Sequence, residues 1–266
     1  MNKTASILAA ALCAAACTSN GPKSLVLYYS QTGTTKAVAE EIATLTGADI
    51  EAFDVTEPYS GTFDETVARC NAEMPAGIVP ELVPLKADLS KYEVIYLGYP
   101  IWCGTYAQPV AALIKSGALE GKTIVPFCTF GSGGLLESTA DLKAKLPSSE
   151  IRNGYGVRTE RLNAAPKELA DFLARNGYID GVFEVLPEFS EQKPVTKNEA
   201  AIFNEACGDY QFPLGTPISC SSRKTSDGTE YIFIAENAYG DATSSARIHV
   251  IAGKADGTKA EFTRVD

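Results

Sequence analysis

The sequence has one histidine and no long apolar segment. With His249 alone among 266 residues, a Ser-His-Asp or Cys-His hydrolase is disfavoured and a metal site of several histidines is excluded. His249 lies in an alternating run, residues 247–251, that is typical of a strand, so we expect a structural or surface role for it. No run of about 18 apolar residues occurs, and we therefore expect no membrane-spanning helix.

Basic residues are also few. The chain has 23 Lys and Arg against 33 Asp and Glu, which gives a formal net charge of -10. An acidic surface disfavours nucleic acid as a partner. It suits protein partners with basic docking surfaces, although the same charge also serves plain solubility. At 266 residues and 45% hydrophobic composition, the chain predicts two globular domains.

The first residues have the features of an export signal. Lys3 precedes an alanine-rich apolar stretch, residues 5–16, which is too short to span a membrane. The following Ala14-Ala15-Ala16-Cys17 resembles the lipobox of bacterial lipoproteins. The resemblance implies a signal peptide over residues 1–17 and a lipid anchor on Cys17. Because Thr18 is not aspartate, it further implies an outer-membrane location facing the periplasm. The alternative is a soluble secreted protein.

From Ser24 to about Tyr178, short apolar runs alternate with helical periodicity. The pattern predicts an α/β fold with a five-stranded parallel, doubly wound sheet and helices on both faces. Such sheets bind ligands beyond the carboxyl ends of their strands. Residues 57–91 interrupt the pattern as an excursion that holds a short helix near residues 63–70. The expected strands are residues 25–29, 50–55, 94–99, 123–128 and 151–157, and the expected helices are 34–45, 108–116, 135–146 and 166–176.

The loop after the first strand has the composition of an anion site. It reads Ser30-Gln31-Thr32-Gly33-Thr34-Thr35 and opens a helix, whose free N–H groups attract anions. Four hydroxyls add donors, whereas capping the helix would need only one. The loop has no lysine of the kind that binds nucleoside triphosphates. It therefore predicts a site for a monophosphate, and simple helix capping is the alternative.

The run from Val26 to Thr35, followed by Ala39 and Ile42, resembles the signature of the flavodoxin family, in its short-chain bacterial branch. The second and third loops of that family correspond to residues 98–105 and 129–134. The resemblance covers residues 24–181 and implies one FMN, with its phosphate on the first loop and its ring between the other two. It assigns no catalytic residue and no metal. The implied cofactor-binding residues are Ser30, Gln31, Thr32, Gly33, Thr34, Thr35, Pro100, Ile101, Trp102, Cys103, Gly104, Thr129, Phe130, Gly131 and Ser132.

Trp102 is the only tryptophan and we expect it in a loop after a strand, where it would stack on a flat ring rather than pack in the core. Cys103 stands where the family often has a second tryptophan. Cys103 lies in the loop after one predicted strand and Cys128 ends the adjacent strand, so the two are either a disulfide or redox-active pair or two buried thiols.

The pattern changes after residue 181. Residues 182–266 predict an α+β module, with one helix over residues 196–210 followed by an antiparallel sheet. It loosely resembles the cystatin fold but lacks the inhibitor's hairpin motif, so we expect a docking or structural role. Cys207 and Cys220 are candidates for a disulfide, or alternatively for two packed thiols.

Together these features predict an FMN-binding electron carrier, exported as a lipoprotein. One alternative is an NAD(P)H-dependent FMN reductase of quinones or similar acceptors, which the lack of a GxGxxG fingerprint disfavours. Another is a non-redox binding protein that works through its C-terminal module.

Overall fold

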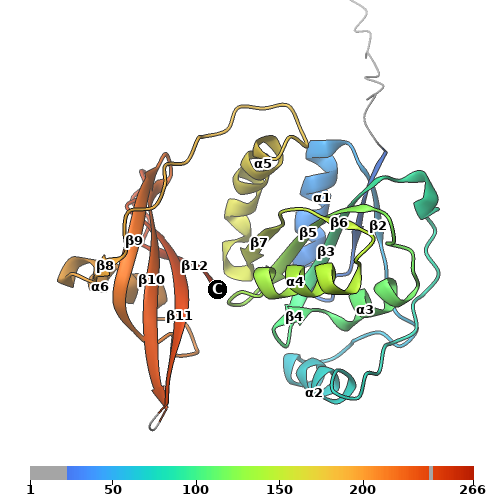
Figure 1. Ribbon diagram of the computed structural model, residues 1–266, viewed down its shortest axis with the longest axis horizontal. Helices are drawn as coiled ribbons and strands as arrows, with labels where there is room; N and C mark the ends of the chain where they lie inside the picture. Colours follow the sequence, from blue (N-terminus) through green and yellow to red (C-terminus); the bar gives the residue numbers. More distant parts are fainter. Residues whose placement is uncertain (1–22, 240–241) are drawn as a thin grey trace, which may run out of the picture.

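The computed structural model describes residues 23–239 and 242–266. Cys17 and the rest of the predicted signal peptide lie outside the described residues. Within the described ranges, no helix is long and apolar enough to cross a membrane. The chain forms two units that stand side by side, each around its own sheet (Figure 1).

The N-terminal unit contains the predicted parallel sheet. Its strands follow the order β2-β1-β3-β5, and both β6 and β7 pair with β5, one at each end of it. The expected fifth strand is therefore two short strands, with residues 152–154 between them. This is the 2-1-3-4-5 order of one class of doubly wound folds. The strands are β1 Ser24–Tyr28, β2 Asp49–Ala52, β3 Val94–Trp102, β5 Thr123–Phe130, β6 Glu150–Ile151 and β7 Tyr155–Arg158, and β4 Thr105–Tyr106 pairs with the end of β3.

Helices cover both faces of this sheet (Figure 1). Apolar side chains of α1 and α5 pack on one face, and those of α3 and α4 on the other. Gly47 ends α1 in the left-handed conformation, which costs little without a Cβ atom. The excursion contains α2, which begins with a capping box of Thr62 and Glu65. The helices are α1 Thr34–Thr46, α2 Phe63–Glu73, α3 Gln108–Lys115, α4 Leu135–Lys145 and α5 Ala165–Arg175, with 3-10 turns at Leu89–Lys91 and Thr159–Ala164.

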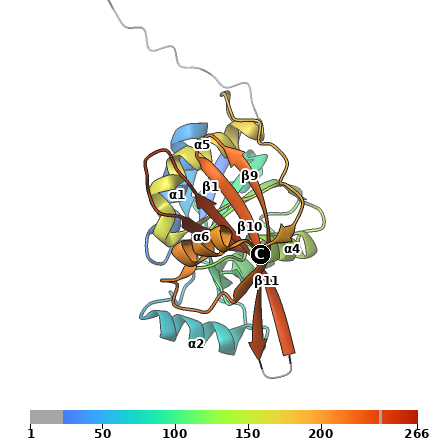
Figure 2. The ribbon, with the colours of Figure 1, turned by 90° about the vertical axis from the view of Figure 1, so that its left-hand side faces the viewer.

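The C-terminal unit, residues 182–266, has one helix on an antiparallel sheet, as predicted. Figure 2 views the molecule from the side of this sheet. Helix α6 begins with a capping box of Thr196 and Glu199, and its Phe203 packs edge-to-face on Phe233 of the sheet at 5.2 Å between ring centroids. The elements are β8 Lys193–Pro194, α6 Lys197–Cys207, β9 Thr216–Thr225, β10 Gly228–Tyr239, β11 Ala242–Ala252 and β12 Glu261–Val265, and the strand order is β12-β11-β10-β9-β8.

Strand β12, at the edge of the C-terminal sheet, connects the two units. It lies beside β7, and Val265 forms a parallel bridge with Gly133, which follows β5. The end of the chain thus reaches the edge of the N-terminal sheet where a doubly wound fold binds its ligand.

Candidate functional site

Three segments meet at the carboxyl ends of β1, β3 and β5. Strand β1 lies between β2 and β3, and the helices that follow β1 and β3 cover opposite faces of the sheet. The chain leaves the sheet in opposite directions at this point, which opens a crevice between the two connections. All three predicted cofactor loops therefore lie at one edge.

The first loop leaves backbone donors free at the start of α1. The Ser30 hydroxyl accepts hydrogen bonds from the amides of Gly33 and Lys36, both at 3.2 Å. Gly33 has a φ of 91°, a conformation that favours glycine. Among the described residues, the amides of Thr34 and Thr35 donate to no protein acceptor. An anion is the natural acceptor for such first-turn amides.

The threonine hydroxyls of this loop differ in their surroundings. Thr35 is fully buried, and its hydroxyl pairs at 2.8 Å with that of Thr129 on β5. Thr34 is half-buried at 3.4 Å from the same Thr129 hydroxyl, and Thr32 is exposed at 3.4 Å from Thr34. Thr35 therefore ties the first segment to the third, whereas Thr32 and Thr34 have only long contacts and are free to bind a ligand.

Trp102 lies on a strand and not in a loop, which corrects one expectation. Strand β3 runs on to Trp102 and turns back through β4, so only residues 103 and 104 form the turn. The indole is half-buried and packs against Tyr29 edge-to-face at 5.6 Å and against Tyr59 at 5.0 Å. These tyrosines fix the ring as one wall of a cavity.

The excursion, residues 57–91, supplies a second wall of this cavity, because hydrogen bonds from Gln31 hold it beside the first loop. The Gln31 amide donates to the Tyr59 carbonyl at 3.1 Å and to the Thr66 hydroxyl at 2.9 Å. The Tyr59 hydroxyl donates to Glu73, which also pairs with Arg69 at 2.7 Å. The Arg69 guanidinium lies 3.8 Å from the centroid of the Tyr59 ring. Helix α2 is held against the first loop by this network.

The cavity between these segments has a volume of about 510 Å³. Eight of the predicted residues line it: Gln31, Ile101, Trp102, Cys103, Gly104, Phe130, Gly131 and Ser132. The other seven do not line it, and these are Ser30, Thr32, Gly33, Thr34, Thr35, Pro100 and Thr129. Most of those seven form the anion loop, which adjoins the cavity through Gln31.

Ten lining residues were not among the predicted cofactor-binding residues, although Gly133 and Gly134 lie in the predicted third loop. Helix α2 contributes three, the end of the glycine-rich loop and α4 contribute three more, and one follows β7. The last three come from the C-terminal unit, where Tyr210 was expected at the end of a helix over residues 196–210 that in fact ends at Cys207. The ten are Phe63, Thr66, Val67, Gly133, Gly134, Glu137, Glu160, Tyr210, Gln211 and Phe212.

The glycine-rich loop after β5 is enclosed by its neighbours. The Val265 amide donates to the Ser132 carbonyl at 2.8 Å. A Cβ atom on Gly133 would lie 2.1 Å from the Val265 carbonyl oxygen, and one on Gly134 would lie 2.6 Å from Ile101. Glycine is therefore required where β12 and β3 approach this loop.

Arg158, at the end of β7, joins the same loop to the C-terminal unit. Its guanidinium donates to the Gly131 carbonyl at 2.7 Å and to the Phe262 carbonyl at 3.1 Å. It also pairs with Glu160 at 3.1 Å and lies 4.2 Å from the centroid of the Phe262 ring. No local sequence signal pointed to this arginine.

Cys103 and Cys128 are not a bridged pair. Both are free thiols, Cys128 being fully buried in the core and Cys103 exposed beside the cavity. Burial raises the pKa of Cys128, whereas the Cys103 thiol lies 3.5 Å from the Asn71 side chain on α2. Cys103 also has a φ of 49°, in the left-handed region, because it forms the turn between β3 and β4.

Cys207 and Cys220 are likewise free, which corrects the proposed disulfide. Both are buried in the core between α6 and the C-terminal sheet. Burial raises the pKa of Cys207 to about 12 and that of Cys220 to about 11. They pack there as small apolar side chains, which was the alternative.

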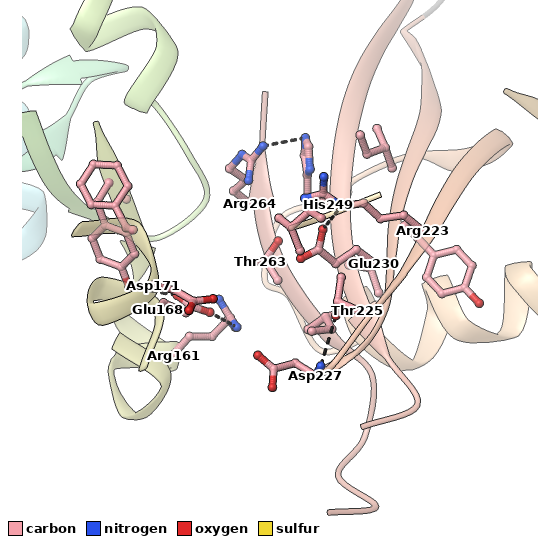
Figure 3. Close-up of a pocket in the computed structure, with 18 of the residues that line it drawn as sticks. Arg161, Glu168, Asp171, Arg223, Thr225, Asp227, Glu230, His249, Thr263 and Arg264 are labelled. Carbon is pink, nitrogen blue, oxygen red and sulfur yellow. Dashed lines mark hydrogen bonds and ion pairs between the residues drawn. The ribbon is translucent and has the colours of Figure 1, made fainter. Parts of the chain in front are cut away.

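A second cavity, of about 520 Å³, lies between α5 and the C-terminal sheet (Figure 3). Most of its charged side chains pair with one another. Arg161 pairs with Glu168 at 2.7 Å, Arg223 with Glu230 at 2.6 Å, and His249 with the C-terminal residue Asp266 at 2.7 Å. Because these groups are paired within the protein, the cavity favours neither an anionic nor a cationic ligand.

The thiols give a direct test of this arrangement. In the folded protein we expect Cys103 alone of the five described cysteines to react quickly with a thiol reagent. The others are buried, and burial both blocks access and disfavours the reactive thiolate. A Cys103→Ser variant should lose the fast phase. Under denaturing, non-reducing conditions all five should react, besides any thiol in residues 1–22. A shortfall would reveal a disulfide.

Several known proteins are similar to the N-terminal part of this chain. One similar solved structure is a protein provisionally named a flavoprotein from Bacteroides eggerthii, with 28% identity and a TM-score of 0.48, and the match covers 56% of this chain and 99% of that one. Another, also provisionally named a flavoprotein, is from Bacteroides uniformis, with 24% identity and a TM-score of 0.47, and the match covers 56% of this chain and 98% of that one. A flavoprotein from Lactobacillus acidophilus in complex with FMN matches at 21% identity and a TM-score of 0.47, over 51% of this chain and 93% of its own. A sequence profile described as flavodoxin matches residues 23–172. Because that match spans more than half of the chain, this protein belongs to the flavodoxin family.

Proposed function

We propose that this chain binds one FMN at the edge of its parallel sheet and acts as an electron carrier. The observation that carries the proposal is the pairing of free first-turn amides at Thr34 and Thr35 with an adjoining cavity walled by Trp102. An anion site beside an aromatic pocket suits a ligand with a phosphate at one end and a flat ring at the other.

The residues present fit such a ligand. The amides of α1 and the hydroxyls of Thr32 and Thr34 would hold the phosphate, and Trp102 would face the ring. The glycine-rich loop lets backbone groups approach the edge of the ring. When bound, the flavin supplies the redox chemistry, whereas the protein contributes binding, orientation and the polarity around the ring.

A carrier is favoured over the reductase because the sequence has no dinucleotide fingerprint. Its net charge of -10 suits redox partners with basic docking surfaces, since opposite charge speeds encounter. The non-redox alternative is weakened by the intact anion loop. The carrier role also requires that electrons reach the ring through a partner protein rather than through a bound nicotinamide.

We predict that FMN affinity depends on Thr32 and Thr34. A Thr32→Val and Thr34→Val double variant removes two donors to a charged oxygen, each worth about 1.5–3 kcal/mol, so the Kd should rise at least about tenfold. Titration with FMN, followed by quenching of its fluorescence, measures this. Thr44→Val is the matched control, because its hydroxyl is bound to the Glu40 carbonyl at 2.8 Å on the exposed side of α1. An unchanged Kd in the double variant refutes the phosphate site.

Anaerobic addition of NADPH to the FMN-loaded protein separates carrier from reductase. As a carrier, the protein should keep its flavin absorbance when NADPH alone is added, and should lose it when dithionite is added. Rapid bleaching by NADPH would contradict the carrier and support the reductase.

We also propose that the protein is an exported lipoprotein attached to the outer membrane through Cys17. The support is the small-residue run Ala14 to Ala16 before the cysteine, after an apolar stretch. A Cys17→Ala variant should move from the membrane fraction to the soluble fraction of the cell. If it still fractionates with membranes, the anchor is elsewhere.

A further inference from the structure

The C-terminal unit reaches the cavity with an aromatic side chain. Tyr210, Gln211 and Phe212, between α6 and β9, line it together with Trp102. Phe212 is 56% exposed, although a phenylalanine in a loop usually gains by burial. Because Phe212 lines the same cavity as Trp102, a flat ring bound there would cover its exposed face.

A row of aromatic rings connects Phe212 to the core of its unit. Phe212 packs on Tyr210 at 5.8 Å between centroids, and Tyr210 packs on Phe262 at 5.2 Å, both edge-to-face. Phe262 is fully buried on β12 and supports the Arg158 guanidinium. The position of Phe212 is therefore set by packing rather than by a free loop.

The same unit also orients the glycine-rich loop. The Val265 amide donates a hydrogen bond to the Ser132 carbonyl. The Arg158 guanidinium donates to the Gly131 carbonyl and also to the Phe262 carbonyl of β12. In a planar trans peptide, the N–H of the next residue points opposite to the carbonyl. The amides of Ser132 and Gly133 consequently point away from these partners.

Those two amides are free donors beside the cavity. Within the described ranges, neither the Ser132 nor the Gly133 amide donates to a protein acceptor, and both residues line the cavity. Donors at this place suit the polar edge of a flat heteroaromatic ring, which has acceptors in its plane. Their direction is set by the contact of Val265 with the Ser132 carbonyl and by that of Arg158, which β12 holds in place, with the Gly131 carbonyl.

We propose that the C-terminal unit is a structural part of the cofactor site: Phe212 forms an aromatic wall against the flavin ring, and β12 orients the Gly133 amide directly and the Ser132 amide through Arg158 toward the edge of that ring. This rests on the proposed FMN binding. It assigns a role to residues beyond 172, outside the match to the flavodoxin profile. It also adds an aromatic residue to a cavity that Trp102 and Phe130 line.

The test is the FMN dissociation constant and the visible spectrum of the bound flavin. Phe212→Ala should raise the Kd about fivefold or more and shift the flavin bands, because an aromatic contact is lost. The matched control is Phe183→Ala, since Phe183 is an exposed phenylalanine of the same unit that does not line the cavity. The control should leave both readouts unchanged.

A second variant tests the backbone contact. In Gly133→Ala the new Cβ atom meets the Val265 carbonyl and must displace β12. Here we expect weaker FMN binding than in the unaltered chain, with the far-ultraviolet circular dichroism of a folded protein retained. No FMN binding by the unaltered chain would overturn the proposed function and the inference with it. Tight binding by the unaltered chain, with a Kd that stays within twofold in both variants, would overturn the inference alone.

Discussion

The Arg158 guanidinium joins the glycine-rich loop of the N-terminal unit to β12 of the C-terminal unit, and the proposed cofactor site depends on this contact. A buried cation is costly unless its donors are all used. Here the donors reach carbonyls of the glycine-rich loop and of β12 and the carboxylate of Glu160, and the charge lies over the Phe262 ring. Burial lowers the pKa of Arg158, yet a guanidinium stays protonated in proteins. The cation is therefore satisfied only when the loop and the C-terminal unit are both in place.

The loops around the cavity are fixed from two sides. The Thr35 and Thr129 hydroxyls join the first and third segments beneath the site, and β12 holds the third segment from the other unit. Contacts made in advance reduce the ordering cost that a ligand would otherwise meet on binding. The free amides and the hydroxyls of Thr32 and Thr34 are what remain for the ligand, since the buried Thr35 hydroxyl is bound within the protein.

Local signals in the sequence predicted the helices and strands. They did not predict the contacts between residues that lie far apart in the chain. The periodicity placed the helices and strands within a few residues, and Thr196 with Glu199 forms the expected capping box. Trp102 was placed in a loop because the predicted strand ended at residue 99, yet pairing with β5 as far as Pro100 and then with β4 carries β3 on to Trp102. Phe212 and Arg158 act through partners far along the chain, which no local pattern reports. The same limit explains the cysteines: proximity of Cys207 and Cys220 followed from topology, but bonding depends on geometry.

Thermodynamic linkage gives the C-terminal unit a reciprocal relation to its neighbour. If its docking orients two amides and presents Phe212, a ligand in the cavity binds the docked arrangement better than an undocked one. That ligand must then stabilise the docking by the same free energy by which the docking strengthens its binding. The interface already uses the Ser132 carbonyl and, through Arg158, the Gly131 carbonyl, and both residues line the cavity. Because these groups belong to both contacts, the free energy of docking and the free energy of ligand binding cannot be independent.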